Sequence, residues 1–479
     1  MTTASFQFLA FALVAAILYN LARPRAWRQA VMLAANACFL ATFSLSVKAF
    51  LPFAGFLLLG FIAVRLMQSD RARSAFAAII IATIVAFIWL KKYAFLPAAT
   101  FIRFPYVTIG LSYIFFRVLH LIIDARNDNL PGRIGILGYL NYTLNFTALV
   151  SGPIQWYQDF AQMQLAPGRP PLDLFIIGES LERIVAGFFK VTVLSLFLSA
   201  GQDHALNMIS PLMSFWGRVG SAIAIAAAYP LYLYFNFSGY TDIVIGVARF
   251  LRLTLPENFN RPFSSSNFID FWGRWHITLS TWLKTYVFNP LTKVLMKEFP
   301  SAEAQPWIGV VAFFVTFFLI GVWHGQTPAF LIFGVLLGTG VSVNKLFQIL
   351  MSKWLGGREF KQLSSNPVYC AFTRGLTFTW FTFSLLWFWS NSQQVASIAR
   401  TAGGAAFATA WLVIFLSATG LLALYEGVRT WVLSFTWDGG PLVQSRYIRT
   451  AWNTALATIC ITVIVILNAP APEIVYKAF

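Results

Sequence analysis

Long runs of apolar residues follow one another along nearly the whole chain. Residues 4–22, 75–90, 308–344 and 454–468 are almost free of charged side chains, and each is near the roughly 20 residues that a helix needs to cross a bilayer. Hydropathy predicts about a dozen spans in all, including 29–47, 49–67, 105–123, 134–150, 174–200, 219–250 (one or two), 306–344 (two), 371–391 and 404–425. The pattern predicts an all-α polytopic membrane protein.

Composition supports a membrane protein and argues against a sizeable soluble domain. Hydrophobic residues make up 58% of the chain and charged residues 11%, which is too apolar for a surface exposed to water. The sequence has no Gly/Ser linker, low-complexity tract or short repeat. We therefore expect residues 1–479 to form a single integral-membrane domain.

The net charge of +17 comes from 34 Lys and Arg against 17 Asp and Glu. These basic residues lie in short loops beside apolar spans, where they face lipid headgroups and set topology, so we expect no nucleic-acid partner. Arg23, Arg25 and Arg28 follow the first span, and the positive-inside rule then places the amino terminus outside. Lys91 and Lys92 do not fit this orientation.

From residue 255 to 305 the apolar signal is interrupted by aromatic, basic and amide side chains. Ser266 or Asn267 can cap a helix that carries Asp270 in its first turn. Aromatic and leucine side chains then recur at spacings of three and four, which predicts one apolar helical face with His276 at its border: Phe268, Phe271, Trp272, Trp275, Leu279, Trp282 and Tyr286. We expect helices that enter the membrane domain without spanning it. The common interpretation is an interfacial helix with Trp anchors, and a compatible, sharper one adds that His276 lies at an entrance lined by protein.

A second histidine, His324, lies within 308–344, a stretch without a formally charged side chain. An ionisable group at such depth is a functional hypothesis by default, although a neutral histidine satisfied by another helix is the structural alternative. Gly325 and Pro328 should end or break its helix, and broken backbone at membrane depth survives only beside protein or a water-filled cavity. Burial without a charged partner keeps a histidine neutral, as a general base must be.

Other catalytic chemistries find little support in the sequence. His120 and His204 have no ligand spacing to the other histidines, and Cys38, Cys370 and Cys460 are scattered, so we expect no metal site. A Ser-His-Asp triad lacks its nucleophile-elbow motif.

Several motifs fall within roughly residues 105–345. They comprise Ser-Gly-Pro-Ile at 151–154 with Asp-Phe at 159–160, Phe-Ser-Gly-Tyr-Thr-Asp at 237–242, Pro-Glu-Asn-Phe-Asn-Arg-Pro-Phe at 256–263, Phe-Trp-Gly-Arg-Trp-His-Ile-Thr-Leu-Ser-Thr-Trp at 271–282 and Gly-Val-Trp-His-Gly at 321–325. Together these motifs resemble the membrane-bound O-acyltransferases, and within them the bacterial branch of the alginate O-acetylation and teichoic-acid D-alanylation proteins. Asn-Pro-Leu-Thr-Lys-Val at 289–294 departs from the alginate type and is closer to the D-alanylation branch.

The resemblance implies a ring of about 11 to 13 transmembrane helices, with re-entrant or interfacial helices around a central tunnel. It implies that His324 is the catalytic histidine and His276 the second active-site position. The tunnel would bring an acyl donor from the cytoplasm to an acceptor from the other face of a bacterial cytoplasmic (inner) membrane.

The implied reaction moves a small acyl group, with acetyl as first choice, from a thioester to a hydroxyl of an exported cell-surface polysaccharide or a partner protein. His324 would act as general base, and His276 or Trp323 would orient the donor or stabilise the oxyanion. Further candidates for substrate binding are Trp272, Trp275, Arg274, Asn260 and Ser280. For Arg274 and Lys284, contact with lipid headgroups is the alternative to a donor phosphate or the acidic surface of a carrier protein.

No bound cofactor is expected beyond the donor, which is acetyl-CoA or an acyl carrier protein with its phosphopantetheine arm. Expected partners are membrane lipid, a carrier protein and an extracytoplasmic acyltransferase. Two alternatives remain open: D-alanyl transfer from a carrier protein to a wall polymer, and, in another class, a transporter or lipid-linked sugar flippase, which predicts internal repeats.

Overall fold

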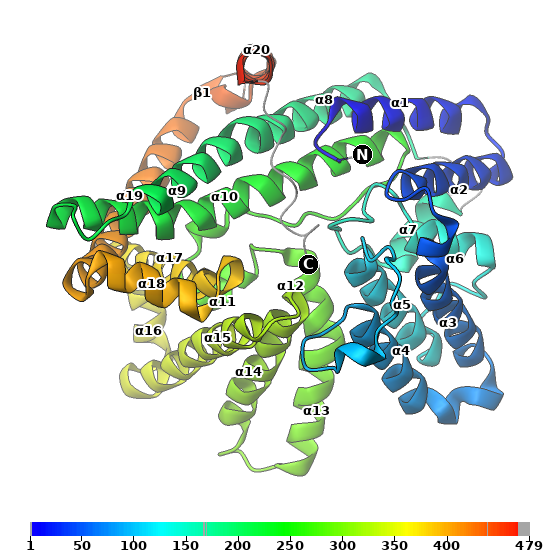
Figure 1. The fold of residues 1–479 in the computed structure, drawn as a ribbon, viewed down its shortest axis with the longest axis horizontal. Coiled ribbons are helices and arrows are strands. Elements are labelled where there is room, and N and C mark those ends of the chain that lie inside the picture. Colours follow the sequence, from blue (N-terminus) through cyan, green and yellow to red (C-terminus); the bar gives the residue numbers. More distant parts are fainter. Residues whose placement is uncertain (1, 166–167, 169, 438, 468–479) are drawn as a thin grey trace. The chain divides into compact units, whose positions relative to one another are not determined.

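The computed structural model describes residues 2–165, 168, 170–437 and 439–467. Helices account for nearly all of its regular structure (Figure 1). The helices form two compact units, each built from separate parts of the sequence. Unit 1 comprises the described parts of Met1–Val191 together with Phe237–Glu257, and unit 2 comprises the described parts of Thr192–Asn236 and Asn258–Asn468.

The described part of unit 1 contains eight α-helices and the second part of a ninth, α10. The helices are α1 (Phe6–Leu21), α2 (Arg25–Ala41), α3 (Leu51–Met67), α4 (Phe76–Leu90), α5 (Leu111–Arg126), α6 (Ile136–Thr143), α7 (Tyr157–Gln164) and α8 (Leu174–Phe189). Short 3-10 helices occur at Val47–Phe50, Asp70–Ala75 and Ala98–Thr100.

Unit 2 begins within the π-helical stretch Lys190–Ser195, which joins α8 to α9. Its α-helices are α9 (Leu196–Met208), the first part of α10 (Phe215–Phe250), α11 (Phe268–Trp272), α12 (Ile277–Leu283), α13 (Asn289–Glu298), α14 (Gln305–His324), α15 (Pro328–Leu355), α16 (Gly357–Leu363), α17 (Pro367–Trp389), α18 (Ser392–Ala402), α19 (Gly404–Ser434) and α20 (Arg446–Leu467). A two-stranded hairpin, β1 (Thr436–Trp437) and β2 (Gly440–Pro441), lies between the last two helices, and 3-10 helices occur at Pro262–Ser264 and Leu442–Gln444.

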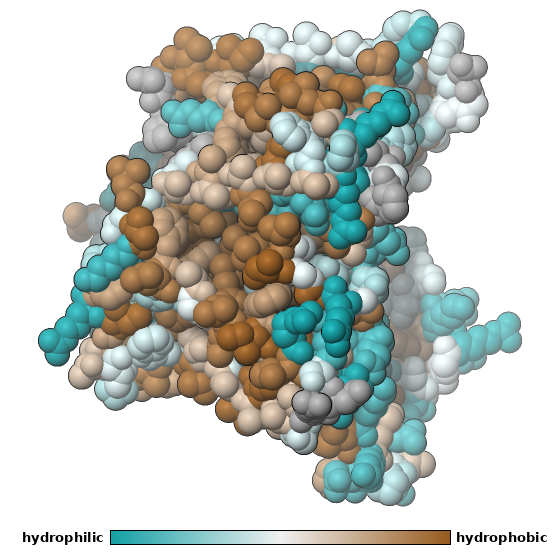
Figure 2. Space-filling view, turned by 90° about the vertical axis from the view of Figure 1, so that its right-hand side faces the viewer, coloured by the Kyte–Doolittle hydropathy of each residue, from teal (hydrophilic) through white to brown (hydrophobic). Residues whose placement is uncertain are grey.

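The fold is that of an all-α polytopic membrane protein. Within the described residues, eight helices are long and apolar enough to cross a membrane: Val47–Met67, Ala72–Leu90, Leu174–Met208, Phe215–Phe250, Gln305–His324, Pro328–Leu355, Gly404–Ser434 and Arg446–Leu467. On the face shown in Figure 2, hydrophobic residues form a broad area and hydrophilic residues gather mainly toward its margins. Such a surface is suited to lipid.

The spans predicted at 4–22, 29–47, 105–123 and 371–391 overlap α1, α2, α5 and α17, which are not among these eight helices. Two further predicted spans also differ from the structure. Residues 219–250 form part of one continuous helix, α10, despite Pro230 within it. The span predicted at 134–150 is wrong, because α6 ends at Thr143 and the chain continues as a buried loop. The carbonyls released there are bound by the fully buried Arg117, which donates to Thr143 O at 2.9 Å and to Ala148 O at 2.6 Å. A long-range side chain thus replaces the helical hydrogen bonds.

Helices α14 and α15 approach each other so closely that glycine is required at the contact (Figure 1). A Cβ atom added to Gly321 would overlap the backbone of Gly334, and one added to Gly334 or Gly338 would lie 2.6 Å or 2.9 Å from a carbonyl oxygen of α14. Small residues that let two backbones approach are typical of helix pairs in membranes. This contact fixes the helix that ends at His324.

Candidate functional site

His324 is the last residue of α14 and is 5% exposed. As predicted, Gly325 ends the helix in an extended conformation and Pro328 begins α15. The imidazole lies against two aromatic rings, with ring centroids 5.2 Å from Phe388 and 5.9 Å from Phe333. The broken backbone therefore places an ionisable side chain in an aromatic, largely dehydrated environment.

His276 lies at a break between α11 and α12, so the single aromatic helix predicted for this region is wrong. The predicted start is confirmed, since the Asn267 side chain caps α11 and Asp270 lies in its first turn. The helix then stops at Trp272, and His276 adopts a left-handed conformation with φ 45° and ψ 50°. Such a conformation is uncommon for a residue other than glycine.

The break is caused by pairing with a segment distant in the sequence. Phe259 and Trp275 form an antiparallel bridge, in which Asn260 N donates to Arg274 O at 2.9 Å and Ile277 N donates to Asn258 O at 3.0 Å. These bonds use backbone groups that a continuous helix would have paired internally. The Pro-Glu-Asn-Phe-Asn motif therefore helps to position His276.

Trp323 lies beside both histidines. Its ring centroid is 4.8 Å from that of His324 and 6.5 Å from that of His276. The separation of the two imidazoles is at most the sum of these distances, within the roughly 10 to 15 Å over which one substrate can address both, although proton transfer itself needs atoms near 3 Å. The indole and the two imidazoles form one compact cluster within unit 2.

A cavity of about 330 Å³ is lined by residues of the helices that carry this cluster, although none of the three cluster residues is among the described lining residues. Its lining includes Ile277, which follows His276, and Ile320, which lies one helical turn before His324. The remaining lining is mostly apolar, with Lys284 as its single charged side chain: Ile269, Trp272, Gly273, Ser280, Thr281, Leu283, Lys284, Phe288, Phe313, Thr316, Phe317 and Val341. An apolar cavity with a few polar groups is typical of a small-molecule site.

Two of the predicted binding residues contribute polar atoms to the cavity lining. Trp272 is 4% exposed, and neither its indole Nε1 nor the buried Ser280 hydroxyl makes a hydrogen bond with any described residue. Buried polar groups are usually paired. Unpaired groups at a cavity are therefore suited to a substrate.

The other predicted binding residues lie elsewhere. Trp275 is 2% exposed and packs in an aromatic cluster, with ring centroids 5.1 Å from Phe259 and 5.0 Å from Phe381. Arg274 forms an ion pair with Asp270, four residues before it, at 2.9 Å. The Asn260 side chain is exposed. None of these three residues lines the cavity, and their substrate-binding roles stay predictions.

Two features of the site were not predicted from the sequence. Asn258 is fully buried, its Oδ1 accepts from the Thr278 hydroxyl at 2.6 Å, and its Nδ2 makes no hydrogen bond with a described residue. The sequence did offer one indication of a role for Asn258, because it lies two residues before Asn260 in the same motif. The second feature is the π-helix Lys284–Phe288, whose first and last residues line the cavity. Such stretches often occur at functional sites.

Burial lowers the pKa of His276 from 6.5 to about 3. Between about pH 3 and pH 6.5, His276 therefore binds a proton in the unfolded chain but not in the folded protein. As a result, the free energy of unfolding falls as pH is lowered below 6.5, by at most about 1.4 kcal/mol per pH unit. His276→Asn removes this effect, and asparagine tolerates the left-handed backbone. We expect the variant to lose less thermal stability than the wild type between pH 7 and pH 5.

The control is His204→Asn, because His204 is exposed on α9. It should show the pH dependence of the wild type. Thermal unfolding in one detergent at both pH values measures the difference. An unchanged pH dependence in His276→Asn would contradict the assignment of a buried, neutral His276.

A second motif, at 237–242, has a structural place in unit 1. Asp242 on α10 accepts from Arg183 Nε at 3.0 Å and from Lys190 Nζ at 2.6 Å, and Arg183 also pairs with Glu257. Gly239 lies against α8, since an added Cβ would be 2.7 Å from the carbonyl oxygen of Gly187. The motif thus joins α8 to α10 through charge and close contact.

Asp242→Asn should destabilise the protein by about 1 to 3 kcal/mol, because Lys190 loses its anionic partner in a partly buried position. Glu179→Gln is the matched control on the same two helices. Its pair with Arg249 is longer, at 3.4 Å, and Glu179 is 37% exposed, so a loss of at most about 1 kcal/mol is expected. Apparent melting temperatures check this ranking, and equal losses would refute it.

Comparison with known proteins identifies relatives over much of the chain. The chain is 28% identical over 321 residues to a teichoic acid D-alanyltransferase of Bacillus subtilis, covering 65% of this chain and 76% of that protein. It is 30% identical over 268 residues to a probable alginate O-acetylase, AlgI, of Pseudomonas fluorescens, covering 55% of this chain and 48% of that protein. A D-alanyltransferase of Streptococcus thermophilus is 29% identical over 266 residues, covering 54% and 61%. The match therefore spans only about half the length of the alginate relative.

The family model of the membrane-bound O-acyltransferases matches residues 107–387. The matched part is more than half of the chain and contains His276, Trp323, His324 and the cavity beside them. The chain belongs to the membrane-bound O-acyltransferase (MBOAT) family.

Proposed function

We propose that this O-acyltransferase moves a small neutral acyl group, acetyl in the first instance, from a cytoplasmic thioester donor to a hydroxyl of an exported cell-surface polysaccharide. The observation that carries the proposal is the cluster of His276, Trp323 and His324 beside an apolar cavity. The cluster combines a candidate base with a candidate hydrogen-bond donor next to space for a substrate. The membrane would be the cytoplasmic membrane of a bacterium, as the bacterial relatives suggest.

In this mechanism His324 is the general base. A thioester is already activated, so the demanding steps are removal of the acceptor's hydroxyl proton and stabilisation of the oxyanion. His324 takes that proton as the hydroxyl oxygen attacks the thioester carbon. The tetrahedral intermediate then collapses, the carbon–sulfur bond breaks, and the proton passes to the departing thiolate.

His276 and Trp323 act on the acyl group without exchanging protons. With its pKa near 3, His276 is neutral at physiological pH, so it orients the donor through hydrogen bonds. The indole N–H of Trp323, which lies beside both imidazoles, stabilises the developing oxyanion in this mechanism. The donor's phosphopantetheine arm occupies the cavity, where the Trp272 indole and the Ser280 hydroxyl bind its amides.

The charge of the cavity favours acetyl over D-alanyl. A D-alanyl group carries an ammonium at neutral pH, and burying a cation is costly without an anionic partner. No Asp or Glu is found among the described lining residues, and the one charged side chain there, Lys284, repels a cation. D-alanyl transfer remains the second candidate, since the Bacillus subtilis relative bears that name and is matched over the larger share of its length.

The test is mass spectrometry of surface polymers from bacteria with and without this protein, complemented by wild type or by His324→Gln. We expect an acetyl ester that disappears with the gene and returns only with wild type. Loss of a D-alanyl ester instead would establish the second candidate. Unchanged polymers would refute both assignments of the acceptor.

Transfer by the purified protein tests the reaction itself. With acetyl-CoA or an acetylated carrier protein as donor and a polysaccharide fragment as acceptor, ester formation would exclude transport of a lipid-linked sugar as the primary activity. If an extracytoplasmic acyltransferase partner is required, the purified protein should release the acyl group from the donor without forming an ester on the polysaccharide.

A further inference from the structure

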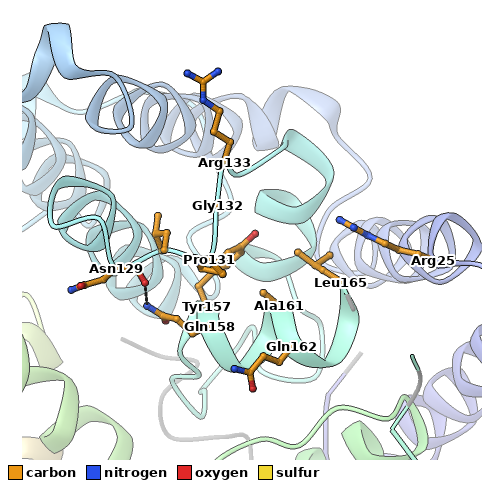
Figure 3. Close-up of a pocket in the computed structure, with 11 residues that line it drawn as sticks. Arg25, Asn129, Pro131, Gly132, Arg133, Tyr157, Gln158, Ala161, Gln162 and Leu165 are labelled. Atoms are coloured by element: carbon orange, nitrogen blue, oxygen red, sulfur yellow. Dashed lines mark hydrogen bonds between the residues drawn. The ribbon is translucent and has the colours of Figure 1, made fainter. Parts of the chain in front are cut away.

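Unit 1 contains a second cavity, of about 490 Å³, which the proposed reaction does not use (Figure 3). One face of α7 forms its base, the loop between α5 and α6 forms one side, and Arg25 at the start of α2 forms another. The lining residues are Arg25, Asn129, Leu130, Pro131, Gly132, Arg133, Tyr157, Gln158, Ala161, Gln162 and Leu165. The cavity is therefore assembled from three separate segments.

Its charge is positive and unbalanced. Arg25 and Arg133 are exposed, and neither forms an ion pair or hydrogen bond with any residue that the structure describes. The lining contains no Asp or Glu among those residues. Burial raises the pKa of the Tyr157 hydroxyl to about 12, and the positive charge of Arg25 acts to lower it. A free guanidinium group is suited to a phosphate, which it can bind through paired hydrogen bonds, and a second one adds to the positive charge of the cavity.

Exposed apolar side chains flank the lining residues along the sequence. Leu21, the last residue of α1, is 68% exposed, and Ile136 and Leu137 in the first turn of α6 are each 46% exposed. Trp27, two residues after Arg25, is 39% exposed, and its indole donates to Leu18 O at 2.8 Å. A tryptophan beside arginines is typical of the level of the lipid headgroups. Exposed apolar side chains that lipid can cover therefore lie within a few residues of Arg25 and Arg133 along the chain.

We propose that this cavity binds the phosphate headgroup of an anionic glycerophospholipid. Arg25 supplies the guanidinium that binds the phosphate, Arg133 adds positive charge elsewhere in the lining, and the acyl chains run along exposed apolar side chains. Basic pockets of membrane proteins recognise anionic lipids by this combination of charge and apolar surface. The inference is independent of the proposed acyl transfer.

Neutral polar groups fit a headgroup that carries hydroxyls, such as the glycerol of phosphatidylglycerol. Gln158 Nε2 donates to Asn129 O at 3.1 Å (Figure 3) and to Asp124 Oδ2 at 2.7 Å. These two bonds fix the orientation of the Gln158 amide. Its Oε1 accepts no hydrogen bond from any described residue. Gln162 is exposed on the same face of α7. A zwitterionic headgroup brings an ammonium or choline cation for which the lining supplies no carboxylate.

The experiment measures lipid binding by the full chain, purified in a neutral detergent and stripped of lipid. Native mass spectrometry is recorded during titration with dioleoylphosphatidylglycerol and, separately, with dioleoylphosphatidylcholine. We expect wild type to bind the anionic lipid at least about tenfold more tightly. Arg25→Gln combined with Arg133→Gln should remove about tenfold or more of that affinity, as expected for losing charge-assisted hydrogen bonds.

The matched control is Arg23→Gln combined with Arg126→Gln. It removes the same charge from neighbouring positions outside the lining, so affinity within about twofold of wild type is expected for this surface change. Gln162→Glu is a second variant, which adds an anion at an exposed position and should weaken binding of phosphatidylglycerol without disturbing the fold. Equal losses in the control and test pairs, or no loss in the test pair, would overturn the proposal.

Coenzyme A and inorganic phosphate are added as competitors to identify the source of the phosphate. Persistence of bound phosphatidylglycerol at millimolar concentrations of either competitor supports a lipid ligand. Displacement by coenzyme A or phosphate, with the same dependence on Arg25 and Arg133, would assign the cavity to a soluble phosphate and overturn the lipid assignment.

Discussion

Replacing His324 by glutamine should lower the rate of acyl transfer by roughly 100- to 10,000-fold, the range expected when a general base is lost. Glutamine keeps a polar side chain beside Phe333 and Phe388 but cannot accept the acceptor's proton in the catalytic step. His324→Ala should be equally inactive, with an additional loss of stability because it leaves a cavity beside those rings. Initial rates of ester formation, normalised to monodisperse protein, measure the effect.

Two further histidine variants test whether the loss of transfer activity is specific to His324. His276→Asn should reduce transfer by a smaller factor, because the proposed part of His276 is orientation of the donor. His204→Asn should leave the rate unchanged, since His204 is exposed on α9, outside the cavity lining. A stable His324→Gln protein that acylates its acceptor at close to the wild-type rate would rule out His324 as the base.

The second large effect is expected from Gly321→Ala. The added methyl group would overlap the backbone of Gly334, so α14 and α15 would have to separate. Overpacking of this kind typically costs about 1 to 3 kcal/mol, and more where only backbone can yield. We expect a lower melting temperature and, because His324 is the last residue of α14, reduced transfer by the protein that still folds.

Gly309→Ala provides a control on the same helix. An added Cβ there would lie 3.6 Å from Lys345 Cε on α15, an ordinary contact with a flexible side chain. Alanine also favours a helix over glycine by about 1 kcal/mol, so stability should be unchanged or higher. A melting temperature for Gly321→Ala at or above that of Gly309→Ala would show that the glycine contact is not tight.

Local patterns predicted the features of the site that depend on neighbouring residues. The cap at Asn267, the acidic first turn, the helix end at Gly325 and the restart at Pro328 all follow from short-range backbone chemistry. The location of His324 in a long uncharged stretch predicted its burial. These features depend on a few consecutive residues, and the sequence is informative at that range.

Features that depend on distant contacts were not predicted. The aromatic spacing of 268–286 fits one helix, but pairing with the segment from Asn258 to Asn260 breaks it and turns His276 out of the helical register. Likewise, the apolar run at 134–150 resembles a span, but Arg117 stabilises a loop there by binding its carbonyls. Periodicity carries no information about a partner more than ten residues away. For the same reason, a cavity lined by five helical segments could not be derived.

The division of α10 between the two units has a consequence for how the chain matures as the ribosome releases it. The described residues of unit 1 are all synthesised once Glu257 has emerged, whereas unit 2 needs residues as far as α20. Domains generally fold as units, those nearest the amino terminus first. The second part of α10 can therefore dock while its first part still lacks the alanines of α19, Ala406 and Ala410, that later cover Val219 and Ala222. During that interval the surface formed by Val219 and Ala222 lacks its packing partner in the bilayer. Substitutions on this surface would therefore affect assembly of the protein in the membrane before they could affect acyl transfer.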